Sequence, residues 1–355
     1  MVRILDSNLS HVAGSLLSLA IFAGIAFYGL VVYWPQPGQN EPKKIEVPSG
    51  SSLEEIAELL HDNSIVDVTK PFVLAAQLMG YEKSIRAGVF LLRDVTSNIR
   101  IIHQLVRSEP VVHRITVPEG LRNEQIAGIF QEKLGLDSTE FLTLCSDEQF
   151  IHSLGLDVPS LEGFLTPETY LFHERESAET IIGTMVEQYR RLFDEILRER
   201  SAELGLTALE AISLASIIEG EAIFDSERSL ISAVYHNRLK KRMKLQADPT
   251  IQYIIKDGPR RLLKRDLLIE SPYNTYLNPG LPSGPINNPG KESILAALNP
   301  ADVDYLYFVA TGEGYHTFTK TEEEHRHAKR KLRALRRKVR LEGKEGTSEK
   351  VGGSR

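Results

Sequence analysis

The chain has 355 residues, a length typical of two or three domains rather than of one small module. Apolar residues make up 42% and charged residues 25%, which excludes a disordered chain, a collagen-like repeat and a disulfide scaffold as descriptions of the whole. The single cysteine, Cys145, excludes an internal disulfide, a CxxC redox motif and a multi-cysteine zinc site. The net charge of −6 combines an acidic body with a basic C-terminal segment, residues 329–355, and an acidic body argues against a nucleic-acid partner.

An apolar segment without charged residues runs from Val12 to Trp34. As a helix rising about 1.5 Å per residue, it can cross a hydrocarbon core of about 30 Å, and aromatic residues gather at its C-terminal end. We therefore expect a transmembrane anchor over 12–34, a cytoplasmic N-terminus over 1–11 and a Pro-rich linker over 35–44. The alternative is a cleaved signal peptide, although the apolar run is long and no small-x-small site follows it. The flanking charges give little information on orientation.

An internal repeat appears at an offset of 70 residues, where IEVPSGSSLEEIAELL from Ile45 matches ITVPEGLRNEQIAGIF from Ile115. Each copy has period-2 apolar residues, a Pro-x-Gly turn and apolar residues at helical spacing, a pattern that predicts strand, turn and helix. Ser51 or Ser52 is positioned to cap the first helix. Together with AGVFLL from Ala87, the first copy resembles a LysM-like module, which implies binding of N-acetylglucosamine-containing glycans; a structural spacer is the alternative.

The segment AISLASIIEGEA, from Ala211 to Ala222, predicts a helix that is buried almost all round. Two carboxylates, Glu219 and Glu221, lie near its end and point about 200° apart at about 100° per residue. The positions that share a face with Glu219 are small or apolar, and such surroundings favour the protonated form that a general acid needs. The alternative is that the helix ends here and both side chains are solvated or ion-paired.

Five further motifs surround this helix in a fixed order. They are LEGFLTPETY upstream, and then LQADPT, YNTY, GLPSGPI and HTF downstream. Taken together with ASIIEGE, the set resembles the endolytic murein transglycosylase family, also called YceG-like, from about Ile45 to about Lys329. Two departures from the family pattern are Gly220, where a basic residue is common, and Ser283 in place of a proline; we expect a softer helix end and a looser turn.

The resemblance implies a role for each matched residue. The family's catalytic glutamate falls on Glu219. The other matched polar residues are implied as substrate-binding, namely Glu162, Tyr170, Glu221, Gln246, Asp248, Asn274, Tyr276 and His316. The loops that carry many of these residues are rich in Pro and Gly, and long loops of this kind in a compact domain are commonly functional. For each polar residue a local structural role stays open: Asp248 before Pro249 is also placed to cap a helix, and Asn274 to hold a turn.

The resemblance also implies a fold and a reaction. We expect an α+β chain with an N-terminal transmembrane helix, a small LysM-like α+β module over 45–110, a larger mixed α/β catalytic domain over 111–328 and a basic tail over 329–355. The implied enzyme is a lyase that cleaves the β-1,4 bond between N-acetylmuramic acid and N-acetylglucosamine within glycan strands. It leaves 1,6-anhydro ends and ends the growth of nascent strands. One carboxyl group serves as acid and then as base, because the substrate's own C6 hydroxyl is the nucleophile.

No metal or cofactor is expected, because the histidines lack zinc-binding spacing. The implied location is the bacterial cytoplasmic membrane, crossed once, with the catalytic domain on the extracytoplasmic side. The implied partners are peptidoglycan strands and cell-wall synthases such as penicillin-binding proteins.

Two other functions stay open at this point. A hydrolytic muramidase would need a second carboxylate to position water, for which Glu162 and Asp248 are candidates. A membrane-tethered scaffold would bind glycan without cleaving it. The tail is either a solvated helical extension or a basic helix that lies on anionic lipid or on an acidic partner.

Overall fold

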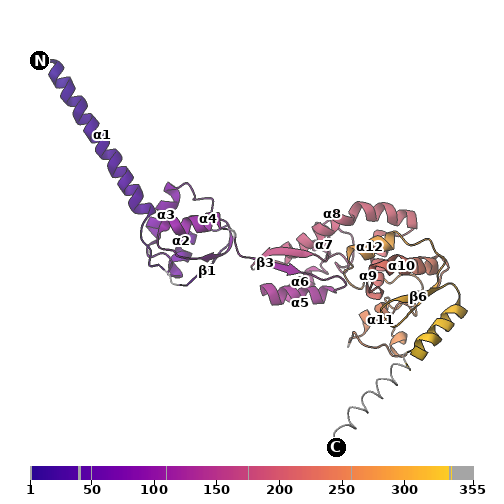
Figure 1. Cartoon of the computed structure of the whole chain (residues 1–355). Coiled ribbons are helices and arrows are strands. Elements are labelled where there is room, and N and C mark those ends of the chain that lie inside the picture. Colours follow the sequence, from indigo (N-terminus) through magenta and orange to yellow (C-terminus); the bar gives the residue numbers. More distant parts are fainter. Residues whose placement is uncertain are drawn as a thin grey trace, which may run out of the picture. The chain divides into compact units, whose positions relative to one another are not determined.

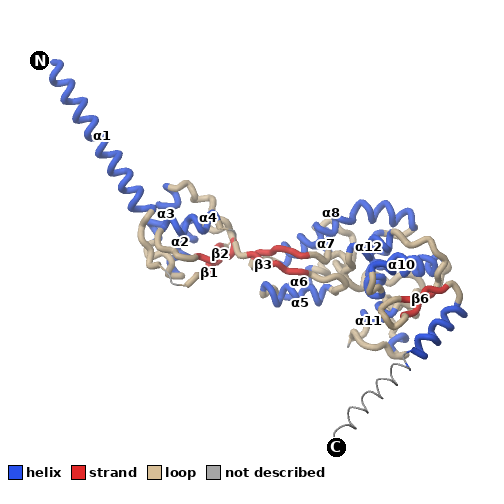
Figure 2. The backbone as a smooth tube through the Cα atoms, viewed as in Figure 1, coloured by secondary structure: helices blue, strands red, loops and turns tan. Residues whose placement is uncertain are grey.

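The structure is a computed structural model that describes residues 2–38, 41–48, 50–108, 110–174, 176–256, 258–335 and 337. The chain divides into two compact units; Figure 1 colours the chain along the sequence, and Figure 2 colours it by secondary structure. The first unit comprises Met1–Arg114 and Leu171–Arg175, and the second comprises Ile115–Tyr170 and Glu176–Arg355. Both units mix helices with two-stranded antiparallel ribbons, so the α+β class expected from the sequence is confirmed, whereas the tail beyond residue 337 lies outside the described residues.

The first unit begins with the long helix α1 (Val2–Val32). From Gly14 to Val32 this helix is long and apolar enough to cross a membrane, and most of its large apolar side chains are exposed in the isolated chain. Its last residues behave differently, because Val31 and Val32 are buried in the hydrophobic core of the first unit. The helix is therefore continuous from the apolar segment into that core.

A small α+β arrangement follows α1. It contains β1 (Lys43–Val47), α2 (Leu53–Asp62), α3 (Thr69–Leu78), β2 (Gly88–Leu92) and α4 (Asn98–Arg107). The strands β1 and β2 pair in antiparallel register, with Ile45 opposite Phe90. Helix α2 has a capping box in which Ser52 accepts from the backbone N–H of Glu55 and the Glu55 carboxylate accepts from that of Ser52, which settles the choice between the two serines.

The repeat predicted from the sequence is present in the backbone. The second copy forms β3 (Val112–Thr116) and α5 (Asn123–Leu134), and α5 begins 70 residues after α2. Gly50 and Gly120 end the two Pro-x-Gly turns with φ of +82° and +75°, a left-handed conformation that favours glycine. Each copy thus turns sharply from its strand into a helix that buries an Ile-Ala pair.

The second unit is mainly helical. It contains α5, α6 (Ser138–Leu144), α7 (Glu148–Ser153), α8 (Ala178–Leu204), α9 (Ala208–Glu221), α10 (Asp225–Lys240), α11 (Asp248–Ile254), η1 (Asp266–Leu268), α12 (Lys291–Leu298) and a helix over residues 322–335. Strand β4 (Thr169–His173) pairs with β3, and β5 (Tyr307–Ala310) pairs with β6 (His316–Thr319). The chain passes from one unit to the other within β3, within β4 and again after residue 175.

Helix α9 lies in the core of the second unit. A capping box between Thr207 and Glu210 begins the helix, and every residue from 211 to 218 is buried. Helices α8, α10, α11 and α12 all pack against it, which explains the lack of a polar face in its sequence. The helix runs through Gly220 to Glu221, and a Cβ at position 220 would lie 2.7 Å from the Cβ of Pro249, so glycine allows that close approach.

Candidate active site

Glu219 lies in the last turn of α9 with a side chain that is 9% exposed. One carboxylate oxygen, Oε2, accepts two hydrogen bonds: from Nη1 of Arg228 at 3.1 Å and from the backbone N–H of Gly290 at 3.0 Å. Arg228 belongs to α10, and Gly290 is the residue that caps the N-terminus of α12. Three helices therefore meet at this carboxylate, and two of them direct hydrogen-bond donors at it.

This environment corrects one expectation from the sequence. The predicted neighbours of Glu219 are small or apolar, but the structure places a guanidinium and a backbone N–H against its carboxylate. The same guanidinium also donates to Asp225 and Ser293, so its position is fixed from three sides. The helical period identifies which residues of α9 share a face, but it does not show what α10 and α12 bring to that face.

A second carboxyl group, which the sequence did not single out, lies beside this cluster. The carboxyl group of Glu119, in the turn between β3 and α5, lies against the backbone of Gly290, and a Cβ at position 290 would be 2.0 Å from its carboxyl carbon. Partial burial and the charge of Glu219 raise the pKa of Glu119, while the charge of Arg228 lowers it. The next residue, Gly120, lies against Glu219, since a Cβ there would be 3.4 Å from Glu219 Cγ.

Asn288 joins the segments around this site, and sequence reasoning did not find it. Its side chain is fully buried, and its amide oxygen accepts from the backbone N–H groups of Gly163 and Leu165 at 3.0 and 2.9 Å. Its amide nitrogen donates to Leu121 O and to Asn123 Oδ1. One side chain thus ties the LEGFL motif, the start of α5 and the Pro/Gly-rich loop together, and the NNPG sequence of that loop is its visible signal.

Glu162 belongs to the same buried network. Its carboxylate accepts from the backbone N–H of Asn123 and from the Asn288 amide, and among the described residues no hydrogen bond joins it to Glu219. Burial, together with the charge of Glu124, raises the pKa of Glu162 to about 8. Glu162 thus helps to hold the start of α5 against the loop that carries Asn288.

Glu221 points away from Glu219, as the helical geometry predicts. It lines a cavity of about 450 Å³ in which five of the eight residues predicted to bind substrate come together: Glu221, Gln246, Asp248, Tyr276 and His316. The hydroxyl of Tyr235 donates to Glu221 at 3.1 Å. Burial, and then the charge of Asp248, raise the pKa of Glu221 to about 7. The cavity therefore contains a carboxyl group that is partly protonated near neutral pH.

The other residues of this cavity have defined partners. Asp248 lies in the first turn of α11 and accepts from the Tyr276 hydroxyl. His316, on β6, contacts the buried carboxylate of Glu227 through both its backbone N–H and its ring Nδ1, at 2.8 and 2.9 Å. Gln246 is exposed in the loop between α10 and α11, two residues before α11 begins, with φ of +51°. Polar groups from α9, α11, β6 and two loops thus converge on one hollow.

Tyr170 and Asn274 lie elsewhere. The Tyr170 hydroxyl donates to the Thr166 carbonyl at 2.7 Å within its own turn, and the residue is 7% exposed. Asn274 is completely buried, donates to the carbonyls of Leu267 and Ile269, and accepts from the backbone N–H of Tyr276. These contacts hold the turn and the loop in shape, which is the local role that the sequence left open for Asn274.

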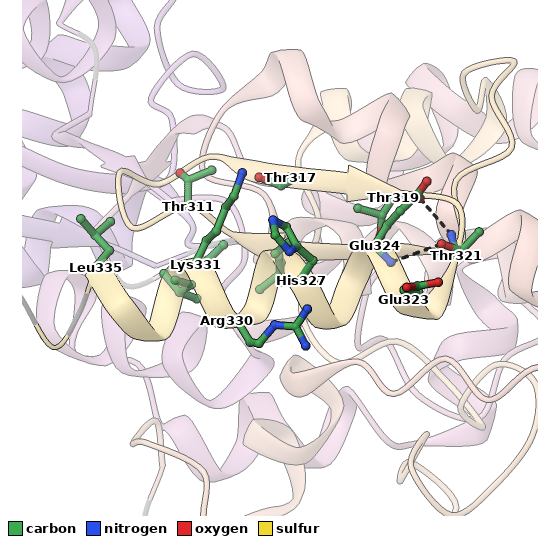
Figure 3. A pocket seen from close by; sticks show the side chains of 14 residues that line it. Thr311, Thr317, Thr319, Thr321, Glu323, Glu324, His327, Arg330, Lys331 and Leu335 are labelled. Atoms are coloured by element: carbon green, nitrogen blue, oxygen red, sulfur yellow. Dashed lines mark hydrogen bonds between the residues drawn. The ribbon is translucent and has the colours of Figure 1, made fainter.

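A larger hollow, of about 910 Å³, lies between the β5–β6 hairpin and the helix over residues 322–335 (Figure 3). Threonine side chains of the hairpin face charged side chains of the helix across it, and Thr321 and Glu324 cap the start of that helix through reciprocal hydrogen bonds. None of the residues predicted as catalytic or substrate-binding lines this hollow. Size alone therefore does not identify the site.

Comparison with known proteins places these features in a family. The YceG-like family matches residues 45–331. An endolytic murein transglycosylase of Bacillus subtilis is 35% identical over 328 residues, which cover 88% of this chain and 91% of that protein. An endolytic murein transglycosylase of Streptococcus pneumoniae is 29% identical, and its alignment covers 89% of this chain but 64% of the longer relative.

A solved structure gives the same result for the fold. A crystal structure of a YceG-like protein from Listeria monocytogenes superposes with a TM-score of 0.56 at 32% identity. The superposition covers 81% of this chain and 99% of that protein. The family match over residues 45–331 includes both the repeat region and the segment that carries Glu219, so the similarity is not confined to one motif.

Proposed function

This chain belongs to the YceG-like family of endolytic murein transglycosylases, and on that premise we propose that Glu219 is the carboxyl group that transfers protons during cleavage of glycan strands. The bond cleaved is the β-1,4 bond between N-acetylmuramic acid and N-acetylglucosamine. The observation that carries the proposal is the pair of donors, Arg228 and the Gly290 N–H, which are directed at one oxygen of a nearly buried glutamate.

These donors match the charge that develops in the reaction. Protonated Glu219 gives its proton to the glycosidic oxygen while C1 of the muramyl residue gains oxocarbenium character. The carboxylate that forms is stabilised by the guanidinium and the N–H, which are already in position and need no reorganisation. The carboxylate then accepts the proton of the C6 hydroxyl as O6 bonds to C1, which restores the acid and gives a 1,6-anhydro end.

In this proposal the cavity beside Glu221, which Glu219 does not line, holds sugar units of the strand away from the bond that is cleaved. Carboxylate, amide, phenol and imidazole groups suit the hydroxyl and acetamido groups of a glycan strand. Its contact residues are Glu221, Gln246, Asp248, Tyr276 and His316. Glu162, Tyr170 and Asn274 support the walls of the site through their buried bonds to backbone groups.

The location of the enzyme follows from α1 and from the substrate. We propose that Gly14–Val32 anchors the chain once in the bacterial cytoplasmic membrane and that both units lie on the extracytoplasmic side, where peptidoglycan is found. A cleaved signal sequence is less compatible with the burial of Val31 and Val32 in the first unit. The β-α-α-β order of residues 43–92 supports a LysM-like glycan-binding role for that unit, and cell-wall synthases are the proposed protein partners.

Product analysis tests the proposal. The full-length protein in detergent is the right material, because removal of α1 would also remove core residues Val31 and Val32. Purified glycan strands are digested and the new ends are weighed by mass spectrometry. We expect internal cleavage and muramyl ends that are one water molecule lighter than hydrolysed ends, with Glu219→Gln as the inactive control. Hydrated ends would show a muramidase instead, and binding without any cleavage would show a scaffold.

The muramidase alternative finds no support in the positions of its candidate carboxylates. Glu162 is bonded to Asn123 and Asn288, and Asp248 to Tyr276. Asp248 lines the cavity of Glu221, which Glu219 does not line. A water-activating pair would need two carboxyl groups on opposite sides of one glycosidic bond.

A further inference from the structure

Glu119 is held at the same backbone residue as Glu219. The N–H of Gly290 donates to Glu219, while the carboxyl group of Glu119 packs so closely on the Gly290 α-carbon that any side chain there would collide with it. Two carboxyl groups thus meet at one glycine, one of them nearly buried and the other on an exposed residue.

The turn that carries Glu119 is fixed by backbone pairing. The N–H of Gly120 donates to Asn288 O at 2.8 Å, and the N–H of Asn288 donates to Leu121 O at 2.8 Å. Gly120 itself lies against Glu219. These bonds fix the backbone of the turn, and with it the α-carbon of Glu119, beside the segment 288–290.

Glu119 differs from the neighbouring carboxylates in the hydrogen-bonding capacity of its side chain. Glu219 and Asp225 are paired with Arg228, and Glu227 is paired with His316. In the part of the chain that the structure describes, no hydrogen bond or ion pair involves the Glu119 side chain. Both of its oxygens remain as acceptors beside the proton-transferring group, and sugars present hydroxyl and acetamido N–H donors.

The first copy of the repeat lacks this group. Pro48 and Gly50 match Pro118 and Gly120, but the residue between them is Ser49 where the second copy has Glu119. The turn itself therefore does not require a carboxylate at this position.

We propose that Glu119 is a further substrate-contacting residue of the active site, whose carboxylate accepts hydrogen bonds from hydroxyl or acetamido groups of the sugar bound at Glu219. The inference rests on the proposed function of Glu219 and adds a second carboxyl group that orients the glycan. Because Glu119 binds sugar and does not activate water, its loss changes the rate and the affinity but leaves the mass of the product ends unchanged.

The first experiment measures cleavage of glycan strands by Glu119→Ala, Glu119→Gln and the control Glu292→Gln in the full-length protein. Glu292 is an exposed glutamate two residues after Gly290, so its variant removes a nearby charge without touching the contact. We expect Glu119→Ala to lower kcat/KM about 10- to 100-fold, as for loss of a hydrogen bond to a charged group. Glu119→Gln keeps one acceptor and should lose less, and Glu292→Gln should stay within about twofold of the wild type.

Gly290→Ala gives an independent test. The backbone of Gly290 has φ of −70° and ψ of 166°, which alanine adopts without strain, and the N–H to Glu219 is kept. The added methyl group must displace Glu119. We expect a rate close to that of Glu119→Ala, an unchanged melting temperature within a few degrees, and no additional loss in the double variant Glu119→Ala/Gly290→Ala.

Binding separates this inference from the proposed function. In the Glu219→Gln background, Glu119→Ala should weaken retention of glycan strands about tenfold or more. Glu119→Ala that cleaves and binds within twofold of its parent would overturn the inference, as would a Gly290→Ala loss that persists in full on top of Glu119→Ala. A wild-type protein that binds strands without cleaving them would overturn the proposed function alone, and the binding comparison would still decide the role of Glu119.

Discussion

The two glutamates of α9 are two residues apart, yet they lie in unlike surroundings. Glu219 has a guanidinium and a backbone N–H against one oxygen, whereas Glu221 has a phenol hydroxyl and a nearby carboxylate in a cavity. Helix α10 supplies one partner to each carboxyl group, Arg228 to Glu219 and Tyr235 to Glu221, from positions seven residues apart that share one face of α10. The difference shows that a helix fixes only the directions of its side chains, and that the neighbouring helices decide what each carboxyl group can do.

The largest expected effect comes from removing the carboxyl group of Glu219, because this group transfers the protons. Glu219→Gln should lower the cleavage rate by about 10³-fold or more, because the amide can neither give nor take the proton. The swap is nearly isosteric, so circular dichroism should show an unchanged fold. A Glu219→Gln cleavage rate within tenfold of the wild-type rate would contradict the assignment of proton transfer to Glu219.

Arg228 tests whether the donors on the Glu219 side contribute to the rate. Arg228→Gln should lower the rate about 100-fold and destabilise the fold by about 3 kcal/mol, because a buried carboxylate loses its partner. The rate of Arg228→Lys should lie between those of the wild type and Arg228→Gln, since one ammonium cannot replace the guanidinium contacts to Glu219, Asp225 and Ser293. Asp225→Asn is the matched control: Asp225 pairs with the same guanidinium but is 73% exposed, and we expect little change in rate or in melting temperature.

The raised pKa of Glu221 should make the free energy of unfolding depend on pH. Its folded pKa, raised to about 7 from the ordinary 4.5, means that the native state holds this proton more tightly than the unfolded state. The stabilisation is fully present below about pH 4.5 and is lost as the pH rises towards 7, by on the order of 2–3 kcal/mol. Glu221→Gln should remove that part of the slope in denaturant unfolding measured from pH 5 to 8. Glu162→Gln should remove a separate part that extends to about pH 8. A Glu221→Gln curve parallel to that of the wild type would contradict this assignment.

The smallest expected effect is on the rate of cleavage at the Glu221 side. Glu221→Gln should lower kcat/KM about tenfold, mainly through KM, because one of several sugar contacts weakens. Tyr235→Phe leaves the carboxyl group in place and removes its hydrogen bond, so it should have a smaller effect in the same direction. Steady-state rates over a range of strand concentrations separate the two parameters. A loss in kcat with KM unchanged would show that Glu221 acts in the chemical step and not in substrate binding.

The features that the sequence predicts correctly are those encoded locally. The apolar run of α9, the capping serine of α2 and the two strand-turn-helix copies each depend on residues that lie close together in the sequence. The family motifs pointed to all five polar residues that line the cavity, whereas no periodicity in the sequence shows that they lie together: Glu221, Gln246, Asp248, Tyr276 and His316. The roles of these residues in the reaction stay predictions.

The environment of Glu219 could not be read from the sequence in the same way. Its contacts come from Gly120, Arg228 and Gly290, and two of these three lie far away along the chain. The apolar neighbours predicted from helical spacing are present along α9, but the carboxylate extends beyond them to α10 and α12. The role of Asn288 was also not predicted. Its side chain joins three segments that are distant in the sequence, and no local pattern indicates such contacts.

The most direct test compares the two glutamates in one assay. Glu219→Gln and Glu221→Gln are incubated with the same glycan strands, and the release of anhydro-ended fragments is followed by mass spectrometry. The account predicts that Glu221→Gln works at least about 100-fold faster than Glu219→Gln and makes the same light ends as the wild type. Equal rates, or a faster Glu219→Gln, would contradict the assignment of proton transfer to Glu219.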